Sequence, residues 1–273
     1  MKNILITGCS SGIGLETALF LKNNNIKVYA SARDEKDVEI LKNLGFKTFK
    51  IDVTKKDEIS FALNEILKED KKLDSVFNNA GFAIPGAIED IKTDDLKELF
   101  DTNFFGLHEL TIQAMKIFRA QGCGKIIQHS SVLGIISLRF RGAYNASKYA
   151  IEGLCDTLRL ETLNSNIYVS TINTGPVTSK FRENSLKNFR EKIDIKSSFW
   201  KNSYESELKA RLESSDDKGA FTLPPISVAK VVLKILNSPN PKPRYYVTKA
   251  TYILGFAKRV LSTSWLDKLL VKI

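Results

Sequence analysis

The sequence is poor in cysteine: its 273 residues include only Cys9, Cys123 and Cys155. An odd number of widely spaced thiols provides neither a disulfide framework nor the ligand spacing of a metal site. We therefore expect a reducing compartment, the cytoplasm, and no bound metal.

The sequence also lacks long hydrophobic runs. Nowhere do about eighteen uncharged apolar residues follow one another, so no membrane span is predicted. The opening MKNILITG becomes strand-like at once, without the longer apolar run and small-residue cleavage site of a signal peptide. Internal repeats and low-complexity tracts are absent too, and 43% of the residues are hydrophobic. We therefore expect one domain over residues 1–273.

Acidic residues are outnumbered by basic ones, 31 to 41, which gives a net charge of +10. Such an excess can indicate nucleic acid as a partner. The lysines are dispersed, however, and no basic stripe interleaved with aromatic residues is present. We therefore predict no nucleic-acid partner and attribute the charge to solvated lysines, which would still favour an anionic small ligand.

Short apolar runs with strand character alternate with helical patterns along most of the chain. The strand-like runs are residues 3–7, 26–32, 46–53, 73–79, 125–131, 167–173 and 244–247. The helical patterns begin near residue 12 or span residues 34–44, 56–69, 93–120 and 142–154. This alternation predicts an α/β fold of the Rossmann type: a doubly wound parallel sheet of about seven strands with helices on both faces. Ligands are expected at the carboxyl ends of the strands.

Two regions depart from this alternation. Residues 179–225 are charged but aromatic-rich, and we expect them to form a helical insertion before the last strand, over the ligand crevice; the aromatic residues are Phe181, Phe189, Phe199, Trp200, Tyr204 and Phe221. Residues 251–273 place apolar side chains at roughly helical spacing among Lys258, Arg259, Lys268 and Lys272. Such a basic amphipathic tail can dock on its own domain, on a second subunit or on a membrane surface, and docking on protein is preferred.

The segment ITGCSSGIG follows the first strand and begins the first helix, with glycines at positions 8, 12 and 14. Glycine allows a tight turn and a close approach of backbone to phosphate, and a helix N-terminus offers free amides. The spacing differs from the Gly-x-Gly-x-x-Gly dinucleotide fingerprint, so alone it is a moderate indication of a cofactor.

After the second strand the sequence reads Ser31-Ala32-Arg33, without the acidic residue that would hold the ribose 2′-hydroxyl of NAD. A guanidinium at this point can pair with a 2′-phosphate. Asp34 is an objection, although it is expected to cap the following helix. We therefore predict NADP(H) in preference to NAD(H).

In GAYNASKYAIEGL, Tyr144 and Lys148 lie four residues apart in a predicted helix, and therefore one turn apart on one face. This spacing alone is common by chance. Here it occurs with a series of other motifs: TGCSSGIG (7–14), Asp52-Val53, NNAG (78–81), Asn103, Ser131 thirteen residues before Tyr144, and TGPVTS (174–179).

Taken together, these motifs resemble those of the short-chain dehydrogenase/reductase family, over residues 2 to about 247. The GPV segment, the aromatic insertion and the RYYVTKAT ending are most similar to the branch of 17β-hydroxysteroid dehydrogenases, retinol dehydrogenases and bacterial aldehyde reductases. Two departures from the family pattern are Thr174, where proline is common, and Ser179, where threonine is usual.

The resemblance implies that a group of residues binds the cofactor. Asp52 would accept from the adenine amino group, Asn79 to Gly81 would line the ribose, and Val177 would face the nicotinamide carboxamide. The complete implied set is Gly8, Ser10, Ser11, Gly12, Ile13, Gly14, Arg33, Asp52, Val53, Asn79, Ala80, Gly81, Tyr144, Lys148, Gly175, Val177 and Ser179.

The resemblance also implies a catalytic set of Asn103, Ser131, Tyr144 and Lys148. A free phenol has a pKa of about 10, too high for ready proton exchange near neutrality. We expect Lys148, together with oxidised nicotinamide, to lower the pKa of Tyr144 so that it can act as general acid and base. Ser131 would donate to the substrate oxygen, and Asn103 would bind a water that links Lys148 to solvent.

The predicted function is that of an NADP(H)-dependent oxidoreductase for an apolar aldehyde, ketone or alcohol, acting as a homodimer or homotetramer. A cofactor-binding regulatory protein of the same fold is the alternative. A sugar-nucleotide epimerase is disfavoured by the glycine spacing. His108 and His129 are interpreted as structural or interface residues.

Overall fold

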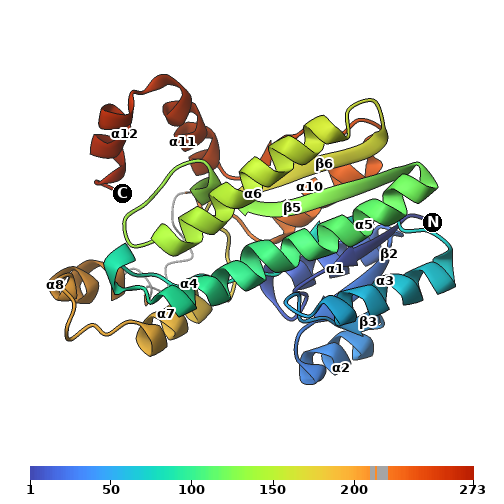
Figure 1. Cartoon of the computed structure of the whole chain (residues 1–273), viewed down its shortest axis with the longest axis horizontal. Helices are drawn as coiled ribbons and strands as arrows, with labels where there is room; N and C mark the ends of the chain where they lie inside the picture. The colour runs from blue at the N-terminus through green and yellow to red at the C-terminus, as the bar shows by residue number, and fades with distance from the viewer. Residues whose placement is uncertain (210–212, 214–220) are drawn as a thin grey trace.

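The computed structural model describes residues 1–209, 213 and 221–273, and it confirms the predicted fold class (Figure 1). Seven strands form one parallel sheet in the order β3-β2-β1-β4-β5-β6-β7. The strands are β1 (Asn3–Ile6), β2 (Lys27–Ala32), β3 (Lys47–Lys50), β4 (Ser75–Asn78), β5 (Cys123–Ser131), β6 (Asn166–Thr174) and β7 (Arg244–Tyr246). Because the order reverses direction at β1 and β4, the crevice for a ligand lies beyond the carboxyl ends of these central strands.

Helices connect the strands and cover both faces of the sheet. They are α1 (Gly12–Asn23), α2 (Glu35–Asn43), α3 (Lys56–Asp70), α4 (Thr93–Phe100), α5 (Leu107–Gln121), α6 (Gly142–Glu161), α7 (Phe181–Lys192), α8 (Lys201–Ser203), α10 (Ile226–Asn237), α11 (Lys249–Val260) and α12 (Thr263–Leu270). In Figure 1, α5 and α6 lie in front of the sheet and α1 and α10 lie behind it. The sequence analysis did not single out α10.

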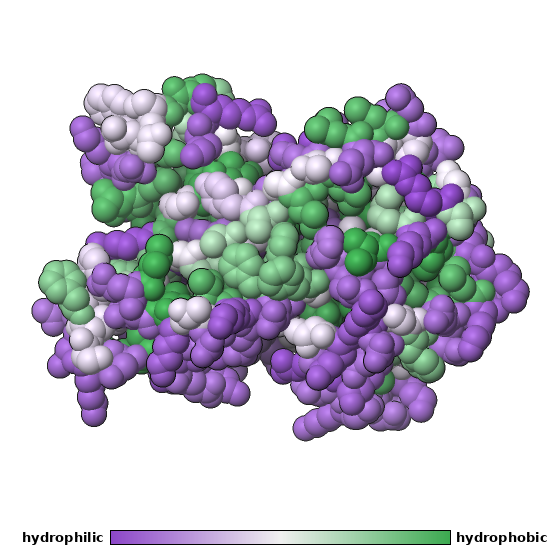
Figure 2. Space-filling model, viewed as in Figure 1, coloured by the Kyte–Doolittle hydropathy of each residue, from purple (hydrophilic) through white to green (hydrophobic). Residues whose placement is uncertain are grey.

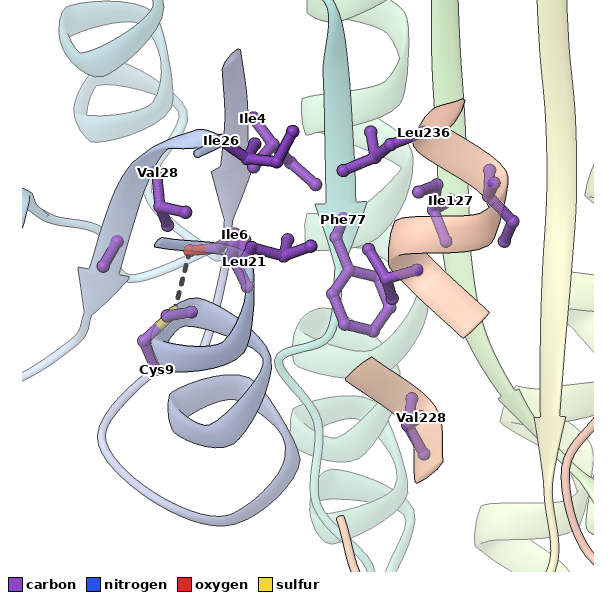
Figure 3. Close-up of a cluster of buried hydrophobic side chains, with 14 of the residues drawn as sticks. Ile4, Ile6, Cys9, Leu21, Ile26, Val28, Phe77, Ile127, Val228 and Leu236 are labelled. Carbon is purple, nitrogen blue, oxygen red and sulfur yellow. Dashed lines mark hydrogen bonds between the residues drawn. The ribbon is translucent and has the colours of Figure 1, made fainter. Parts of the chain in front are cut away.

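Two apolar clusters, one on each face, hold the helices to the sheet. Successive residues of a strand point to opposite faces, so Ile4 and Ile6 of β1 belong to one cluster and Leu5 to the other. Figure 3 shows the first cluster, in which α1 and α10 pack against β1, β2 and β4. The buried Cys9 thiol at its border donates to the carbonyl of Ile6. Both faces of the sheet are thus buried, as continuous apolar strands require.

The predicted helix over residues 93–120 is not one regular α-helix. Between α4 and α5, residues Asp101–Gly106 form a π-helical segment, η2. A wider turn of this kind changes the direction of the side chains that follow it, and such segments are frequent at functional sites. Here the segment contains Asn103, which is fully buried.

Side-chain hydrogen bonds join the carboxyl ends of four neighbouring strands. The hydroxyl of Thr7 accepts from the backbone amides of Asn79 and Ala80 at 3.0 and 3.1 Å. The Asn79 amide nitrogen donates to the carbonyl of Thr7. The amide oxygen of Asn79, 2.9 Å from His129 Nδ1, therefore accepts a hydrogen bond from that ring. His129 Nε2 then faces the hydroxyl of Thr174 at 3.3 Å. Burial keeps this imidazole neutral, so when Nδ1 carries the proton, Nε2 faces the Thr174 hydroxyl without one.

The predicted insertion lies between β6 and β7, and the structure places helices α7 and α8 and the π-helical segment η4 (Tyr204–Leu208) in it. Phe189 and Tyr204 pack there against Phe140 and Ile84. The rest of the predicted insertion includes residues 210–212 and 214–220, which lie outside the described residues.

The predicted amphipathic tail forms α11 and α12. Leu254, Ala257, Leu266 and Leu270 pack on Val132 and its neighbours, directly after β5. Within the described part of the chain, none of the helices has the length and apolarity needed to cross a bilayer.

The neutral His129 makes stability depend on pH. Burial, and secondarily the charge of Lys148, lower the pKa of His129 from 6.5 to about 3. The unfolded chain therefore binds a proton below pH 6.5 that the folded chain does not, and the free energy of unfolding falls as pH decreases. Between pH 7 and pH 5, His129 accounts for a loss of up to about 2 kcal/mol.

Denaturant titrations of wild type, His129→Gln and His129→Leu at these two pH values measure this loss. Whatever each substitution does to stability at pH 7, both variants should lose less stability than wild type on acidification. An unchanged pH dependence in both would show that His129 is protonated in the folded protein.

Candidate active site

The glycine-rich loop is closed so tightly that side chains are excluded from it. Gly8 has a φ of +71°, and a Cβ there would lie 2.9 Å from Ala80 Cα. A Cβ on Gly14 would lie 2.1 Å from the Gly8 carbonyl oxygen. The backbone can therefore approach a ligand closely at the N-terminus of α1, where free amides point outward.

The other predicted phosphate-side residues border this loop. Ser10 is exposed, Ser11 and Ile13 are half-buried, and Ser11 occupies the N-cap of α1 without a side-chain capping bond. A Cβ on Gly12 would lie 3.1 Å from Ser179 Cβ, so the segment after β6 closes over the loop. These features fit the pyrophosphate of a dinucleotide.

Arg33 and Asp52 follow β2 and β3 at the same edge of the sheet. The Arg33 side chain is 71% exposed, and its Nε lies 3.8 Å from Asp34. Asp34 occupies the N-cap of α2, as expected, but its side chain makes no capping bond. Asp52 accepts from the amide and hydroxyl of Thr54 at 3.0 and 2.8 Å, and the adjacent Val53 is buried.

The loop after β4 connects the glycine-rich loop to the predicted catalytic residues. Asn79 donates to the carbonyls of Thr7 and Gly8. A Cβ on Gly81 would lie 3.0 Å from Asn103 Oδ1 and 4.0 Å from Lys148 Nζ. A bare backbone at residue 81 therefore lets the loop lie directly against both side chains.

Lys148 is a buried cation, with only 5% of its surface exposed. Its ammonium donates to the carbonyl of His129 at 2.7 Å and lies 5.5 Å from the centre of the Tyr144 ring. Burial lowers the pKa of Lys148 to about 8, although the charge of Glu152 opposes this shift. The side chain thus holds its proton less firmly than an exposed lysine.

The pKa of the Tyr144 phenol differs from the expectation. Burial raises the pKa of its phenol above the ordinary value, and the hydrogen-bonding interaction with Ser131 only opposes this increase. Among the protein's own groups, the desolvation of a phenolate therefore outweighs the hydrogen bond with Ser131. With these groups alone, Tyr144 keeps its proton and can donate it. Phe181, from the insertion, covers the phenol, with ring centres 5.4 Å apart.

Ser131 ends β5 beside Tyr144. Its hydroxyl accepts from the amide of Leu133 at 3.1 Å and donates to the carbonyl of Thr174 at 3.4 Å. The competing hydroxyl, Ser130, is buried without a hydrogen-bond partner, on the side of Gly134. Alternation along the strand thus leaves Ser131 as the hydroxyl that approaches the phenol.

Asn103 uses its side chain to connect two segments. It accepts from the amide of Phe82 and donates to the carbonyl of the same residue, each at 2.9 Å, and it donates to the hydroxyl of Ser147 at 3.2 Å. The loop after β4 is thereby fixed to α6. The expected water relay stays a prediction.

The segment after β6 contributes the remaining predicted site residues at the carboxyl edge of the sheet. A Cβ on Gly175 would lie 2.1 Å from the hydroxyl of Thr248, at the start of α11. Val177 forms an isolated parallel bridge with Leu223, and the Ser179 hydroxyl accepts from the amide of Phe181. Every predicted site residue thus lies on or beside the carboxyl edge of the sheet.

Sequence reasoning did not identify the hydrogen-bonded series from Thr7 to Thr174. The signal was present as His129 in the polar second half of KIIQHSS, together with Thr174 where proline is common. Among the described residues, no three histidine, cysteine or acidic side chains are grouped as a metal would require.

A cavity of about 700 Å³ lies beside the first turns of α6. Its walls are largely apolar and aromatic, with Leu138, Phe140, Tyr149 and Trp200 among them, and Arg139 and Lys258 add positive charge at its border. The Arg139 guanidinium lies 4.8 Å from the centre of the Phe140 ring. Glu89 also lines the cavity, whereas Ser131, Tyr144 and Lys148 do not. The cavity therefore suits an extended apolar molecule but lies on another side of α6 than Tyr144.

Known proteins share both the sequence and the fold of this chain. The family model described as short chain dehydrogenase matches residues 2–189. The uncharacterized oxidoreductase YbbO of Escherichia coli is 37% identical over 270 residues, which cover 98% of this chain and 94% of the relative. The 3-ketodihydrosphingosine reductase of Bacteroides thetaiotaomicron is 31% identical and covers 96% and 92% of the two chains.

Among solved structures, ElxO with NADP bound superimposes with a TM-score of 0.72 at 23% identity, covering 90% of this chain and 96% of ElxO. This likeness concerns the fold. Because the family match covers most of the sequence and the relatives span nearly all of it, the chain belongs to the short-chain dehydrogenase family of oxidoreductases.

Proposed function

We propose that this protein is an NADP(H)-dependent oxidoreductase that interconverts an apolar aldehyde or ketone and its alcohol. The observation that carries the proposal is the grouping of Tyr144, Lys148 and Ser131 beside a glycine-rich loop that no side chain could enter. A proton donor, a buried cation and a hydrogen-bond donor thus lie at the edge where a dinucleotide would be held.

Each of these residues has a separate role in carbonyl reduction. NADPH, when bound, supplies the hydride. Tyr144 holds a proton on its phenolic oxygen and can donate it to the carbonyl oxygen. Ser131 donates a hydrogen bond to that oxygen as negative charge develops on it. Lys148 supplies positive charge that stabilises the phenolate left behind.

The remaining parts of the site orient these groups. Asn103 fixes the loop of Phe82 to α6, which keeps Gly81 against Lys148. Phe181 covers Tyr144 and excludes water from the phenol. The predicted water beside Asn103 would return protons to Lys148.

An apolar substrate is supported by the cavity next to α6 and by the aromatic residues of the insertion. The name of the Bacteroides relative states that it reduces a keto compound. A preference for NADP(H) is supported by Arg33, whose exposed guanidinium follows β2 where a 2′-phosphate would lie.

We further propose that the whole chain is one domain, located in the cytoplasm, and that copies assemble as a homodimer or homotetramer. Phe105 of η2, Ile112 of α5 and Tyr149 of α6 are large apolar side chains exposed on neighbouring elements, which supports association there. The tail α11–α12 is the candidate for contact with a membrane surface.

Replacing Tyr144 with Phe removes the proton donor without changing the shape of the site. We expect kcat/KM for aldehyde reduction to fall by about 10²- to 10⁴-fold. Tyr149→Phe is the matched control. Tyr149 lies about one turn after Tyr144 on α6, and its hydroxyl donates to the carbonyl of Ile135, outside the helix.

NADPH oxidation across a panel of aldehydes and ketones measures this loss. The reaction mechanism is wrong if Tyr144→Phe is as active as wild type. Tight NADPH binding with no turnover of any substrate would instead favour the regulatory alternative.

Arg33→Ala removes the charge proposed to bind the 2′-phosphate. The KM for NADPH should rise by about tenfold or more, since the lost contact is a charge-assisted hydrogen bond. The KM for NADH should change little. Lys36→Ala, which removes an exposed cation at the second residue of α2, is the control. An equal rise in the KM for NADPH and in the KM for NADH would show that Arg33 does not cause a preference for NADP(H).

Trp200→Ala enlarges the cavity on its insertion side. The kcat/KM for dodecanal should fall by about tenfold, because an apolar contact is lost, while that for propanal should stay nearly constant. The adjacent Phe199 is 86% exposed, so Phe199→Ala should affect neither substrate. If dodecanal and propanal respond to Trp200→Ala alike, the cavity does not hold the substrate chain.

A further inference from the structure

The tail helices are attached to the protein along one face and leave a second apolar face exposed. On the attached side, Leu254 and Ala257 of α11 and Leu266 and Leu270 of α12 pack on the segment after β5. A Cβ on Gly255 would lie 2.9 Å from the ring of Tyr246, so α11 also lies close against β7. The tail is therefore a fixed part of the fold, and its outer face has a defined orientation.

The outer face is apolar and aromatic to a degree that no other surface of the described chain matches. Phe256 and Trp265 are 67% and 66% exposed. With them, the exposed large apolar side chains of the tail are Tyr252, Ile253, Val260, Leu261, Leu269, Val271 and Ile273. In α11 four of these recur at intervals of one, three and four residues, which places them on one side of the helix. Figure 2 shows apolar residues at the surface of the tail, at the upper left.

Cations border this apolar face. Residues 249–273 contain Lys249, Lys258, Arg259, Lys268 and Lys272, and one acidic residue, Asp267. Of these cations, Lys258 lies about 160° around α11 from Phe256 and lines the cavity beside α6 instead. The ammonium of Lys268 lies over the Trp265 ring at 5.0 Å. Asp267 is two residues from Trp265 and so lies about 160° around α12 from it. The exposed face thus combines aromatic side chains with positive charge and has its acidic group on another side.

We propose that the outer face of α11 and α12 docks on an anionic lipid bilayer. Aromatic and aliphatic side chains would enter the interface between headgroups and acyl chains, and the cations would contact anionic headgroups. Tryptophan and tyrosine are the side chains that prefer this interface. The helices lie along the surface, because neither is long enough to cross the bilayer.

Charge favours the bilayer over a second copy of the chain as the occupant of this face. In a symmetric pair, the same cations from both copies would meet with only Asp267 of each to balance them. An anionic surface balances all of them.

Sedimentation with vesicles tests the proposal on the intact protein. Wild type should pellet with vesicles of equimolar phosphatidylcholine and phosphatidylserine but not with phosphatidylcholine alone, and salt should release it. Phe256→Ser combined with Trp265→Ser should lower the partition coefficient by about tenfold or more for each aromatic residue lost. The matched control is Phe61→Ser, at an exposed phenylalanine on α3.

A second pair of variants isolates the charge. The double variant Arg259→Glu with Lys268→Glu should abolish vesicle binding. The double variant Lys230→Glu with Lys234→Glu on α10 changes the net charge equally and should retain most of the vesicle binding. NADPH turnover with propanal should be retained in all variants, which separates this proposal from the proposed reaction. Equal vesicle binding by wild type and the aromatic variant would overturn it. So would a wild-type oligomer that the aromatic variant dissociates without any vesicle binding.

Discussion

The burial of the Lys148 ammonium is the constraint to which the rest of the site conforms. A buried cation is unfavourable unless hydrogen bonds and charge compensate for lost water. Here the carbonyl of His129 accepts from it, and the carboxylate of Glu152 lies one turn further along α6. Because the His129 carbonyl belongs to β5, the cation fixes α6 to the strand that carries Ser131. Tyr144 is then held beside Ser131 by the backbone geometry of the helix.

The position of His129 depends in turn on the ends of the neighbouring strands. Its imidazole lies between Asn79 after β4 and Thr174 at the end of β6, and Asn79 donates to the carbonyls of Thr7 and Gly8. Any shift of one strand along its axis would break these bonds and leave buried polar groups unpaired. The same contacts therefore hold the glycine-rich loop and the proposed catalytic residues in a fixed arrangement. Burial disfavours a charged imidazole in this position, because it lowers the pKa of His129 to about 3.

The sequence was sufficient to predict the strands and the loops at their carboxyl ends, because both depend on local signals. Apolar runs such as NILIT become buried strands wherever helices cover both faces, and the glycines mark turns that tolerate no side chain. The raised pKa of Tyr144 was not foreseen, because desolvation depends on what covers the phenol, and Phe181 arrives from a distant segment. The π-helical turn at Asn103 likewise depends on the loop of Phe82, which the asparagine side chain binds on both its amide and its carbonyl.

The amphipathic pattern of residues 251–273 shows a further limit of local signals. Periodicity indicates that a helix has an apolar side, but it does not indicate how much of that side the protein covers. In the structure the apolar residues occupy two opposite sides of the tail, and only one of them packs on the protein. The attachment lies next to the site, since Gly175 contacts Thr248 at the start of α11 and the tail packs on Val132, which follows Ser131. The tail therefore adjoins the two segments that carry Ser131 and Gly175.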